Sequence, residues 1–492
     1  MSVEKIIIRK SPGETHTALL SDERLVELHI DRTGRSSLVG NIYLGRVQVL
    51  KRNLEAAFVS IGEFQDGFLA LPEVRPEGKT GGCISDFINE GDSILVQVLS
   101  DPVEGKGAKL TTHIHLLGTY LVFRPLRAGI SVSRRITNQK KIDYLFKITS
   151  NLTPKDGGFI VRTNAVEALE KEIDKDATLL IECWRKIQKD IIKINPPDLV
   201  YGEVDPACRS IRNFNNGELK EVIVDGADTF CGIKEYCNVH FPWSKASIIS
   251  YKGPGDIFEY YGIAEQIEIA FSTKVDLMGG GYLIISNTPA LCTIDVNTGN
   301  ADGISREQTA FNVNLEAATE VALQIRLRNL SGLIVVDFVS LKKNFHKKTV
   351  LKTLKEAAFN DPLGVNIAGF TRLGLVEMTR KRIGLSLEKI VNGSELLEKS
   401  KSAESCALDA LRQVMSEFRN CVYNRGKDGV LIRAQEKIIE QFEGKSGGNA
   451  TAATALSEVQ DKLGLIINLE ADRTFLEGQY EVLFGMEKLG HE

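Results

Sequence analysis

Two aspartates stand within apolar stretches of the chain, and their surroundings point to metal chemistry. Asp295 follows residues 291–294 and Asp337 follows residues 332–336, and both stretches are typical of strands. An unpaired carboxylate in an apolar strand is unfavourable, and two carboxylates side by side repel each other. A bound divalent cation removes both penalties, and oxygen ligands that leave room for phosphate favour Mg²⁺. The alternative is that each aspartate ends its strand and faces solvent or a helix N-terminus.

The segment between these strands must position the aspartates, and residues 305–328 are expected to form a helix. A strand, a helix and a strand of this length make a crossover unit, which predicts two parallel, neighbouring strands. Asn297 lies two residues after Asp295 on the same strand face, where it could orient that carboxylate. Its alternative role is that of a turn residue before Gly299. The helical spacing is carried by Phe311, Leu315, Ala318, Val321, Ala322 and Ile325.

The composition limits the class of protein. A length of 492 residues suits three or four domains, and the net charge of −4 means that any nucleic-acid surface must be local. None of the eight cysteines forms a C-x-x-C pair, so no structural zinc site or thioredoxin-like motif is visible. No apolar run reaches the ~20 residues of a membrane span, and the N-terminus lacks signal-peptide character. We therefore expect a cytoplasmic protein.

Short strands and turns divide the N-terminal half of the chain. Residues 1–35 predict two or three strands, and residues 38–117 predict a small closed barrel of the OB type. On such a barrel Phe58 and Phe68 could stack on bases, at ~1–3 kcal/mol each. The alternative is that both rings fill the barrel core. Lys106 lies in a Gly-Lys-Gly loop that could approach a phosphate, or it is a solvated loop charge.

Later segments carry possible phosphate ligands. Arg162 and Thr163 end an expected strand, and a guanidinium with a hydroxyl suits a terminal phosphate, although most such dipeptides are surface residues. A long helix is expected over 166–194. Residues 371–382, which include Arg372, are rich in cations and could hold an RNA backbone near Mg²⁺, or they begin a solvated helix. Polar residues 399–404 predict a linker, and residues 445–453 a flexible loop.

Taken together, the chain over about residues 1–385 resembles the catalytic part of the ribonuclease E/G family of bacterial endoribonucleases. The stretches that carry the resemblance appear in the family's order. They are 41–43, 54–59, 67–69, 134–136, 160–163, 294–297, 311–318, 332–338 and 372–378.

The resemblance implies an α/β multidomain fold. An RNase H-like subdomain is interrupted by an S1 (OB-type) β-barrel and a 5′-sensor region, and a DNase I-like α/β subdomain and a small C-terminal α/β region follow. The implied boundaries are 1–37 with 208–280 for the RNase H-like subdomain, 38–117 for S1, 118–207 for the 5′-sensor, 281–400 for the DNase I-like subdomain and 401–492 for the C-terminal domain.

The resemblance also implies roles for individual residues. Asp295 and Asp337 match the Mg²⁺-binding aspartates, with Mn²⁺ as an alternative ion, and Asn297 matches the asparagine that supports the first of them. Arg162 and Thr163 match the grip on a 5′-monophosphate, and Gly118 and Val122 match the other wall of that pocket. Phe58, Phe68 and Lys106 match the S1 residues that grip single-stranded RNA. Arg134 and Arg372, which lie in basic stretches of the chain, are further candidates for RNA binding.

One departure concerns zinc. Members of the family usually carry a Cys-Pro-x-Cys motif through which two protomers share a zinc ion. The corresponding stretch, residues 390–406, offers one cysteine, Cys406, and no second ligand at that spacing. We therefore expect no zinc, and a homodimer would be held by other contacts. The chain also lacks a long scaffold tail, which makes it closer to the compact ribonuclease G-like form.

The implied function is that of a Mg²⁺-dependent endoribonuclease. It would hydrolyse single-stranded RNA to 5′-phosphate and 3′-hydroxyl ends, with a 5′-monophosphate favouring cleavage, in processing of rRNA precursors or decay of mRNA. Two alternatives remain: a non-catalytic RNA-binding protein that uses the S1 barrel, and a phosphodiesterase that acts on DNA. Metal-dependent cleavage would distinguish the endoribonuclease from the non-catalytic RNA-binding protein. Competition between RNA and DNA substrates would distinguish it from the DNA phosphodiesterase.

Overall fold

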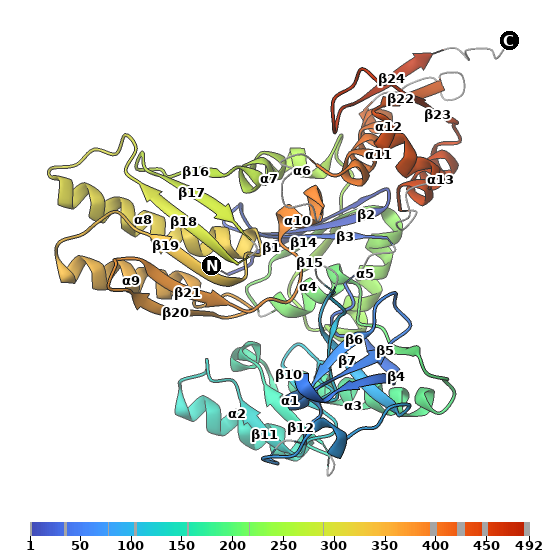
Figure 1. Cartoon of the computed structure of the whole chain (residues 1–492), viewed down its shortest axis with the longest axis vertical. Helices are drawn as coiled ribbons and strands as arrows, with labels where there is room; N and C mark the ends of the chain where they lie inside the picture. The colour runs from blue at the N-terminus through green and yellow to red at the C-terminus, as the bar shows by residue number, and fades with distance from the viewer. Residues whose placement is uncertain are drawn as a thin grey trace. The chain divides into compact units, whose positions relative to one another are not determined.

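The protein is a multidomain α/β chain, as expected (Figure 1). The chain divides into two compact units. The first is formed by residues 1–36, 221–230 and 248–492, and the second by residues 37–220 and 231–247. The computed structural model describes residues 2–33, 37–76, 78–102, 106–154, 157–215, 217–288, 290–393, 401–420, 429–444 and 451–486.

The first unit contains a five-stranded sheet in the order β15-β14-β1-β2-β3. β1 (Lys5–Ser11), β2 (Glu14–Ser21) and β3 (Arg24–Arg32) form an antiparallel meander, which confirms the strands expected over residues 1–35. β14 (Glu221–Asp225) runs parallel to β1, and β15 (Ser247–Ser250) lies outside it. Apolar residues of this sheet share a core with α6 (Ile257–Tyr260), α7 (Ile263–Phe271) and α10 (Leu387–Asn392).

The second sheet of this unit carries both aspartates. Its order is β16-β17-β18-β19-β21-β20, formed by β16 (Lys274–Asp276), β17 (Tyr282–Asn287), β18 (Leu291–Asn297), β19 (Gly332–Asp337), β21 (Val376–Arg380) and β20 (Val365–Phe370).

The helices α8 (Arg306–Leu327) and α9 (Asn344–Ala358) lie side by side against this sheet (Figure 1). Alternate strand residues such as Ile294 and Val336 are buried with them in one core. Residues of the other parity face away from this core: both aspartates are exposed, while Val335 and Asn297 are partly exposed. The helix predicted over 305–328 and the parallel pairing of its two flanking strands are therefore confirmed.

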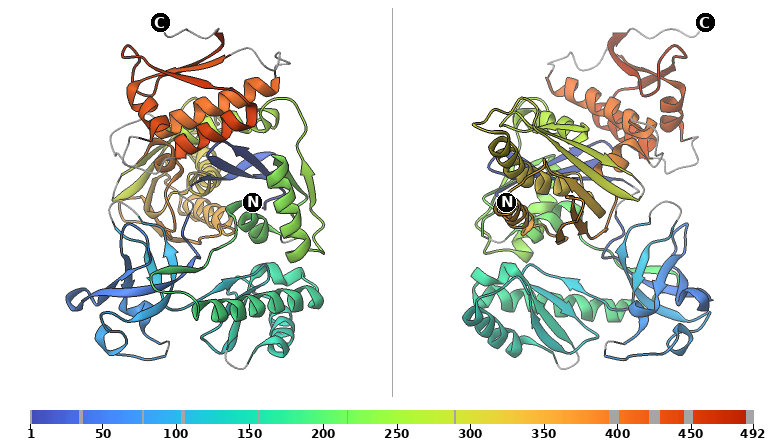
Figure 2. Two further views of the ribbon diagram at one scale, coloured as in Figure 1. Left: turned by 90° about the vertical axis from the view of Figure 1, so that its right-hand side faces the viewer. Right: turned by 60° about the vertical axis from the view of Figure 1, so that its left-hand side comes forward.

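The C-terminal part of the first unit is a three-stranded sheet, β23-β22-β24, packed with helices (Figure 2). Its elements are α11 (Ala403–Asn420), β22 (Gly429–Ala434), α12 (Glu436–Glu443), α13 (Thr451–Leu463), β23 (Ile467–Ala471) and β24 (Tyr480–Met486). The expected linker and flexible loop are wrong at their C-terminal ends, because Glu404 lies in α11 and Ala452 lies buried in α13. Residues 399–400 and 445–450 lie outside the described ranges.

The second unit contains the barrel predicted over residues 38–117. Its strands run in the order β4-β5-β6-β8-β7, and pairing of β4 with β7 closes the cylinder. Close strand approach requires glycine at two points: a Cβ on Gly45 would lie 2.6 Å from Val59, and one on Gly67 would lie 2.4 Å from Leu110. The elements are β4 (Ile42–Lys51), η1 (Arg52–Leu54), β5 (Ala56–Ser60), β6 (Gly67–Ala70), α1 (Leu71–Val74), η2 (Ile84–Asp86), β7 (Ser93–Ser100) and β8 (Lys109–Thr111).

The rest of the second unit is a four-stranded sheet, β11-β12-β10-β9, with helices. The helix expected over 166–194 begins later, at Glu170, because Thr163–Glu167 forms a 3-10 turn. The elements are β9 (Leu116–Leu117), β10 (Leu121–Arg124), β11 (Gly129–Val132), α2 (Gln139–Leu152), β12 (Gly158–Val161), η3 (Thr163–Glu167), α3 (Glu170–Ile191), α4 (Pro206–Phe214) and α5 (Ala227–His240), which contains residues of both units. β13 (Asp198–Tyr201) pairs instead with β4 of the barrel sheet. Among the described residues no helix has the length and apolarity needed to cross a bilayer.

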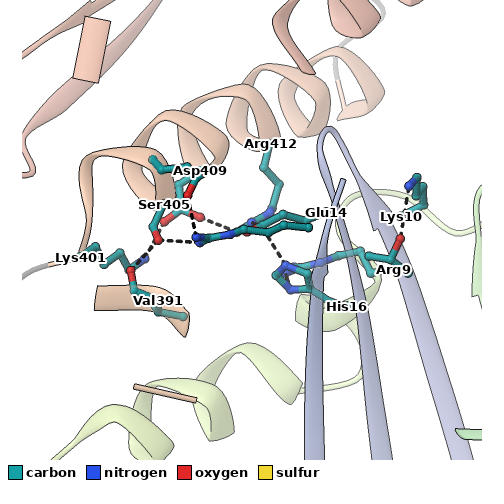
Figure 3. A network of polar contacts seen from close by, with 12 residues as sticks. Arg9, Lys10, Glu14, His16, Val391, Lys401, Ser405, Asp409 and Arg412 are labelled. Atoms are coloured by element: carbon teal, nitrogen blue, oxygen red, sulfur yellow. Dashed lines mark hydrogen bonds and ion pairs between the residues drawn. The ribbon is translucent and has the colours of Figure 1, made fainter. Parts of the chain in front are cut away.

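A buried polar network joins α11 to the first sheet (Figure 3). The carboxylate of Glu14 accepts hydrogen bonds from His16 Nε2 at 2.8 Å, Arg32 Nε at 2.9 Å and Arg412 Nη2 at 2.8 Å. Arg32 in turn donates to Ser405 Oγ at 2.7 Å. Burial raises the pKa of Glu14, but His16 and the two arginines lower it more, and the net shift is downward. A paired, ionised Glu14 therefore links α11 to the first sheet.

The imidazole of His16 is neutral in this network. Arg9 Nη2 lies 2.8 Å from Nδ1, and since a guanidinium only donates, Nδ1 is the acceptor and Nε2 carries the proton given to Glu14. Burial, followed by the charge of Arg9, lowers the pKa of His16 to about 4.

This geometry predicts a stability change with pH. The folded pKa of His16 is about 4 and its ordinary value is 6.5, so the unfolded chain takes up the extra proton first as the pH falls. Neutral His16 contributes fully to the free energy of unfolding above pH 6.5. As the pH falls from 6.5 to 4 that contribution is lost, which lowers the free energy of unfolding by on the order of 2–3 kcal/mol. His16→Gln keeps a donor for Glu14 and an acceptor for Arg9 but cannot titrate. Urea unfolding followed by circular dichroism at pH 7 and 4.5 should show a smaller pH effect for the variant; equal effects contradict the assignment.

Candidate active site

Asp295 and Asp337 are direct neighbours across the parallel pairing of β18 and β19. Their Cα atoms are register partners, and both side chains are exposed on the sheet face opposite α8 and α9. Asn297 lies on the same strand face, and its Nδ2 donates to Asp295 Oδ2 at 2.8 Å. Two carboxylates and one amide thus come together as the sequence predicts.

The two carboxylates have no cationic partner in the described part of the chain: no lysine, arginine or histidine there forms an ion pair with either of them. The described residues also contain no group of three or more His, Cys, Asp or Glu side chains that could hold a metal ion. A divalent cation at this pair would therefore keep most of its coordination positions for water and phosphate oxygens, which is the manner in which Mg²⁺ is commonly bound.

Arg372 lies at the same end of this sheet. It occupies the turn between β20 and β21, where Thr371 N donates to Leu375 O at 2.7 Å and Gly374 adopts φ +95°. β21 begins at Val376, the register partner of Val336, so the turn adjoins the end of β19 that carries Asp337. Arg372 is exposed. The alternative of a solvated helix start over 371–382 is wrong, because these residues form a turn and a strand.

Helix α8 fixes the loop that follows Asp337. Asn314 is fully buried; its Nδ2 donates to Val339 O at 2.7 Å, and its Oδ1 accepts from Val339 N at 3.0 Å. Glu307 accepts from the backbone N–H groups of Lys342 at 3.0 Å and Lys343 at 3.2 Å. These N–H groups, the first above all, lower the pKa of Glu307 to about 2.

The same helix also fixes the neighbouring turn. The carboxylate of Glu316 accepts from Gly279 N at 3.2 and 3.0 Å, and the next residue, Gly280, accepts at its O from Asn300 N at 3.0 Å. Sequence reasoning missed Glu307, Asn314 and Glu316. One signal was available for Asn314: it is a polar residue within the buried stripe of a helix, where a polar side chain is expected to have a partner.

The residues predicted to bind a terminal phosphate lie near one another in the second unit. Arg162 follows β12, and its guanidinium donates to Gly118 O and to Asn213 Oδ1, the latter at 3.2 Å. Val122 is the register partner of Ile160 on β12. Burial, and then the charge of Arg212, lowers the pKa of Arg162 to about 10.

Thr163 and Arg134 lie near the same strand ends. Thr163 is exposed directly after Arg162. Val132 on β11 pairs with Val161 on β12, so exposed Arg134 leaves the sheet beside Arg162 and Thr163. The structure thus brings the sensor candidates and Arg134 to one end of a four-stranded sheet.

Asp176 fixes the backbone next to Gly118. Its carboxylate accepts from the backbone N–H groups of Thr119 at 3.1 Å, Tyr120 at 2.9 Å and Leu121 at 2.9 Å. A Cβ on Gly118 would lie 2.4 Å from Asp176 Oδ2, which explains the glycine. Burial raises the pKa of Asp176 despite these hydrogen bonds. Sequence reasoning missed this residue, because its partners lie more than fifty positions away.

The barrel residues Phe58 and Phe68 lie outside the barrel core. They are register partners on β5 and β6, their ring centroids are 5.9 Å apart, and both are partly exposed, whereas Val59 and Leu69 fill the core. The core-filling alternative is therefore wrong. Exposed Lys106 precedes Ala108, whose carbonyl accepts from Phe68 N at 2.7 Å. The two rings and the lysine thus lie on adjacent segments.

Comparison with known proteins agrees with this arrangement. The model of the Ribonuclease E/G family matches residues 115–383. Ribonuclease G of Haemophilus influenzae is 36% identical over 98% of this chain and 100% of its own length, and ribonuclease G of Escherichia coli K12 is 32% identical over 97% and 99%. Ribonuclease E of Escherichia coli K12 is 35% identical over 76% of this chain and 36% of its own length.

The chain therefore belongs to the ribonuclease E/G family. This confirms the family and the enzyme class, an endoribonuclease, that the sequence predicts.

The hydrogen bonds of Asn314 predict a clear stability effect. Asn314→Ala leaves the N–H and C=O of Val339 without their partner at a buried site, which should lower the free energy of unfolding by about 2–4 kcal/mol. Asn312→Ala, two residues away on the exposed face of α8, is the control and should change it by less than about 0.5 kcal/mol. Equal urea-unfolding midpoints for the two variants would show that the buried amide does not hold the loop.

Proposed function

We propose that the chain is a Mg²⁺-dependent endoribonuclease that hydrolyses single-stranded RNA and leaves 5′-phosphate and 3′-hydroxyl ends. The observation that carries the proposal is the in-register pairing of Asp295 with Asp337, with Asn297 donating to the first of them. The names of the relatives, ribonuclease G and ribonuclease E, support RNA as the substrate. Precursor rRNA and mRNA are the proposed transcripts, and the cytoplasm is the proposed location.

Two adjacent, exposed carboxylates without a cationic partner among the described residues fit a divalent cation. Mg²⁺, or Mn²⁺ in its place, supplies Lewis-acid stabilisation of the scissile phosphate and lowers the pKa of a water. Asp295 and Asp337 hold the ion, and the N–H group of Asn297 keeps the Asp295 carboxylate in one orientation. Exposed Arg372, at the same end of the sheet, binds the RNA backbone.

We assign the domains on the same basis. The first sheet belongs to an RNase H-like subdomain (1–37 and 208–280), and the barrel is the S1 domain (38–117). The sheet of β9–β12 belongs, apart from β9, to the 5′-sensor region (118–207), and the sheet of β16–β21, apart from β16, to a DNase I-like subdomain (281–400). Residues 401–492 remain as the small C-terminal domain. The closed five-stranded barrel supports the S1 assignment most directly.

In the barrel, Phe58 and Phe68 offer partly exposed rings on which bases of single-stranded RNA stack, and Lys106 offers a charge for the backbone. Arg134 extends the basic surface of the sensor region. We propose no zinc ion, and a homodimer held by other contacts. Residues 394–400, part of the stretch expected to lack the zinc motif, lie outside the described ranges.

The sensor assignment rests on Arg162 and Thr163. A partly buried guanidinium, fixed by Gly118 O and Asn213 Oδ1, stands beside an exposed hydroxyl, and this pair suits a terminal phosphate. A 5′-monophosphate bound here favours cleavage if it binds the productive state more tightly than the other states.

Asp337→Asn tests the catalytic assignment. Because the substitution removes one of two metal-binding charges, cleavage of a short single-stranded RNA should fall at least about 10²–10³-fold while the RNA Kd changes little. Asp461→Asn, an exposed aspartate of α13, is the control and should cleave normally. Loss of RNA binding together with cleavage would give Asp337 a structural role. A wild-type chain that binds RNA but does not cleave it with Mg²⁺ would favour the non-catalytic RNA-binding alternative.

Arg162→Ala should abolish the preference for 5′-monophosphorylated over 5′-hydroxylated RNA, because the charge that grips the phosphate is lost. Thr163→Val, which removes only an exposed hydroxyl, should reduce the same preference without altering the fold. Both variants should cleave 5′-hydroxyl RNA at the wild-type rate. A ratio of the two kcat/KM values that stays at the wild-type level in both variants would contradict the sensor assignment.

A further inference from the structure

Helix α9 carries a straight stripe of positive charge on its outer face. At 100° per residue, Lys348, Lys352, Lys355 and Phe359 fall within an arc of roughly 60° and span about 16 Å along the axis. All four side chains are exposed. Phe359 is the C-cap residue of α9, has helical backbone angles and is 58% exposed. The opposite face of the helix, with Val350 and Leu354 at 0% exposure, packs into the core.

The stripe lies on an open part of the surface, and the side chains that border it all come from α9 and its C-terminal end. Leu351 flanks the stripe on one side and Glu356 on the other.

The local charge is strongly positive in a chain of net charge −4. Residues 342–359 contain six lysines against a single glutamate. Within the described structure Lys352 forms a 3.7 Å pair with Glu356, while Lys348 and Lys355 have no carboxylate partner. A helix face built only for solvation is expected to alternate charges at i, i+4 spacing and to keep aromatic rings away from water. This face has one such pair, Lys352 with Glu356, but it leaves Lys348 and Lys355 without one and exposes the ring of Phe359.

We propose that the outer face of α9 is an additional binding surface for single-stranded RNA, with the three lysines on the backbone phosphates and Phe359 stacked on a base. A basic track combined with an aromatic platform is the combination by which proteins hold single strands without reading their sequence. The surface begins close to the candidate active site in sequence, because exposed Lys342 and Lys343 follow Asp337 and lead into α9.

The spacing of the stripe suits a single strand rather than a duplex. The three lysines are about 6 and 4.5 Å apart along the helix axis, and Phe359 lies about 6 Å beyond Lys355. Their flexible stems let the ammonium groups follow successive phosphates. Stacking on Phe359 needs an unpaired base, because the bases of an RNA duplex are stacked on each other.

The test compares RNA affinity in the full-length chain. Lys348→Gln/Lys352→Gln/Lys355→Gln is set against a control triple, Lys252→Gln/Lys437→Gln/Lys462→Gln, which removes the same charge from exposed positions of the same unit. Kd for a labelled single-stranded RNA of about 25 nucleotides is measured in EDTA over a range of salt, with RNA integrity checked afterwards. The α9 triple variant should bind the RNA about 5–20-fold more weakly at 0.1 M salt. The slope of log Kd plotted against the logarithm of the salt concentration should be smaller by about 2 than that of the wild type. The control should stay within about twofold of wild type.

Phe359→Ala separates stacking from charge. It should weaken binding of single-stranded RNA about fivefold or more, with an unchanged salt slope and no effect on duplex RNA of the same sequence. Equal affinity of the α9 triple and the control, or an equal effect of Phe359→Ala on duplex, would overturn the inference.

The inference rests on the proposed function only in taking RNA as the substrate, and the two can fail separately. A wild-type chain that does not bind RNA would refute the proposed function. A wild-type chain that binds and cleaves RNA, with an α9 triple equal to the control, would refute this inference alone.

Discussion

The parallel pairing of β18 with β19 is the constraint on which the candidate active site depends. Side chains alternate along a strand, so a shift of one residue would turn Asp337 toward the core under α8 and α9, and a shift of two would part it from Asp295. The observed register places two like charges side by side, an unfavourable arrangement by itself. Apolar residues on the covered face, such as Ile294 and Val336, hold the register against that repulsion.

Helix α8 does more than connect the two strands. Its buried face supplies the apolar contacts, while Asn314, Glu307 and Glu316 bind backbone groups of the loop after β19 and of the turn beside the end of β18. Each of these side chains hydrogen-bonds to the main chain, and Glu307 Oε1 also lies 3.0 Å from His346 Nδ1. One rigid helix therefore fixes backbone positions on both sides of the site. Loop residues held in this way can be positioned as precisely as residues of a helix or strand.

The sequence was sufficient where one local pattern determines the structure. The apolar spacing of residues 305–328 predicts α8 to within a residue or two, and a crossover unit then requires parallel strands. It was insufficient where a side chain meets a partner far along the chain. Asp176 shapes the turn at Gly118 from 58 positions away, and nothing near it in sequence reveals this. The placement of Phe58 and Phe68 outside the barrel core likewise depends on strand register, which composition does not specify.

The net charge of −4 does not indicate where RNA would bind, because RNA binding depends on how the charged residues are distributed and a sum over the chain does not contain that information. On α9 the core determines only the inner face, through Val350 and Leu354. Its outer residues have no packing role, so their identity is free to follow another requirement. Six lysines with one glutamate over residues 342–359 leave the remainder of the chain more acidic than its total suggests. The segment that follows Asp337 is therefore a basic stretch within an otherwise acidic chain, a distribution that the net charge alone does not reveal.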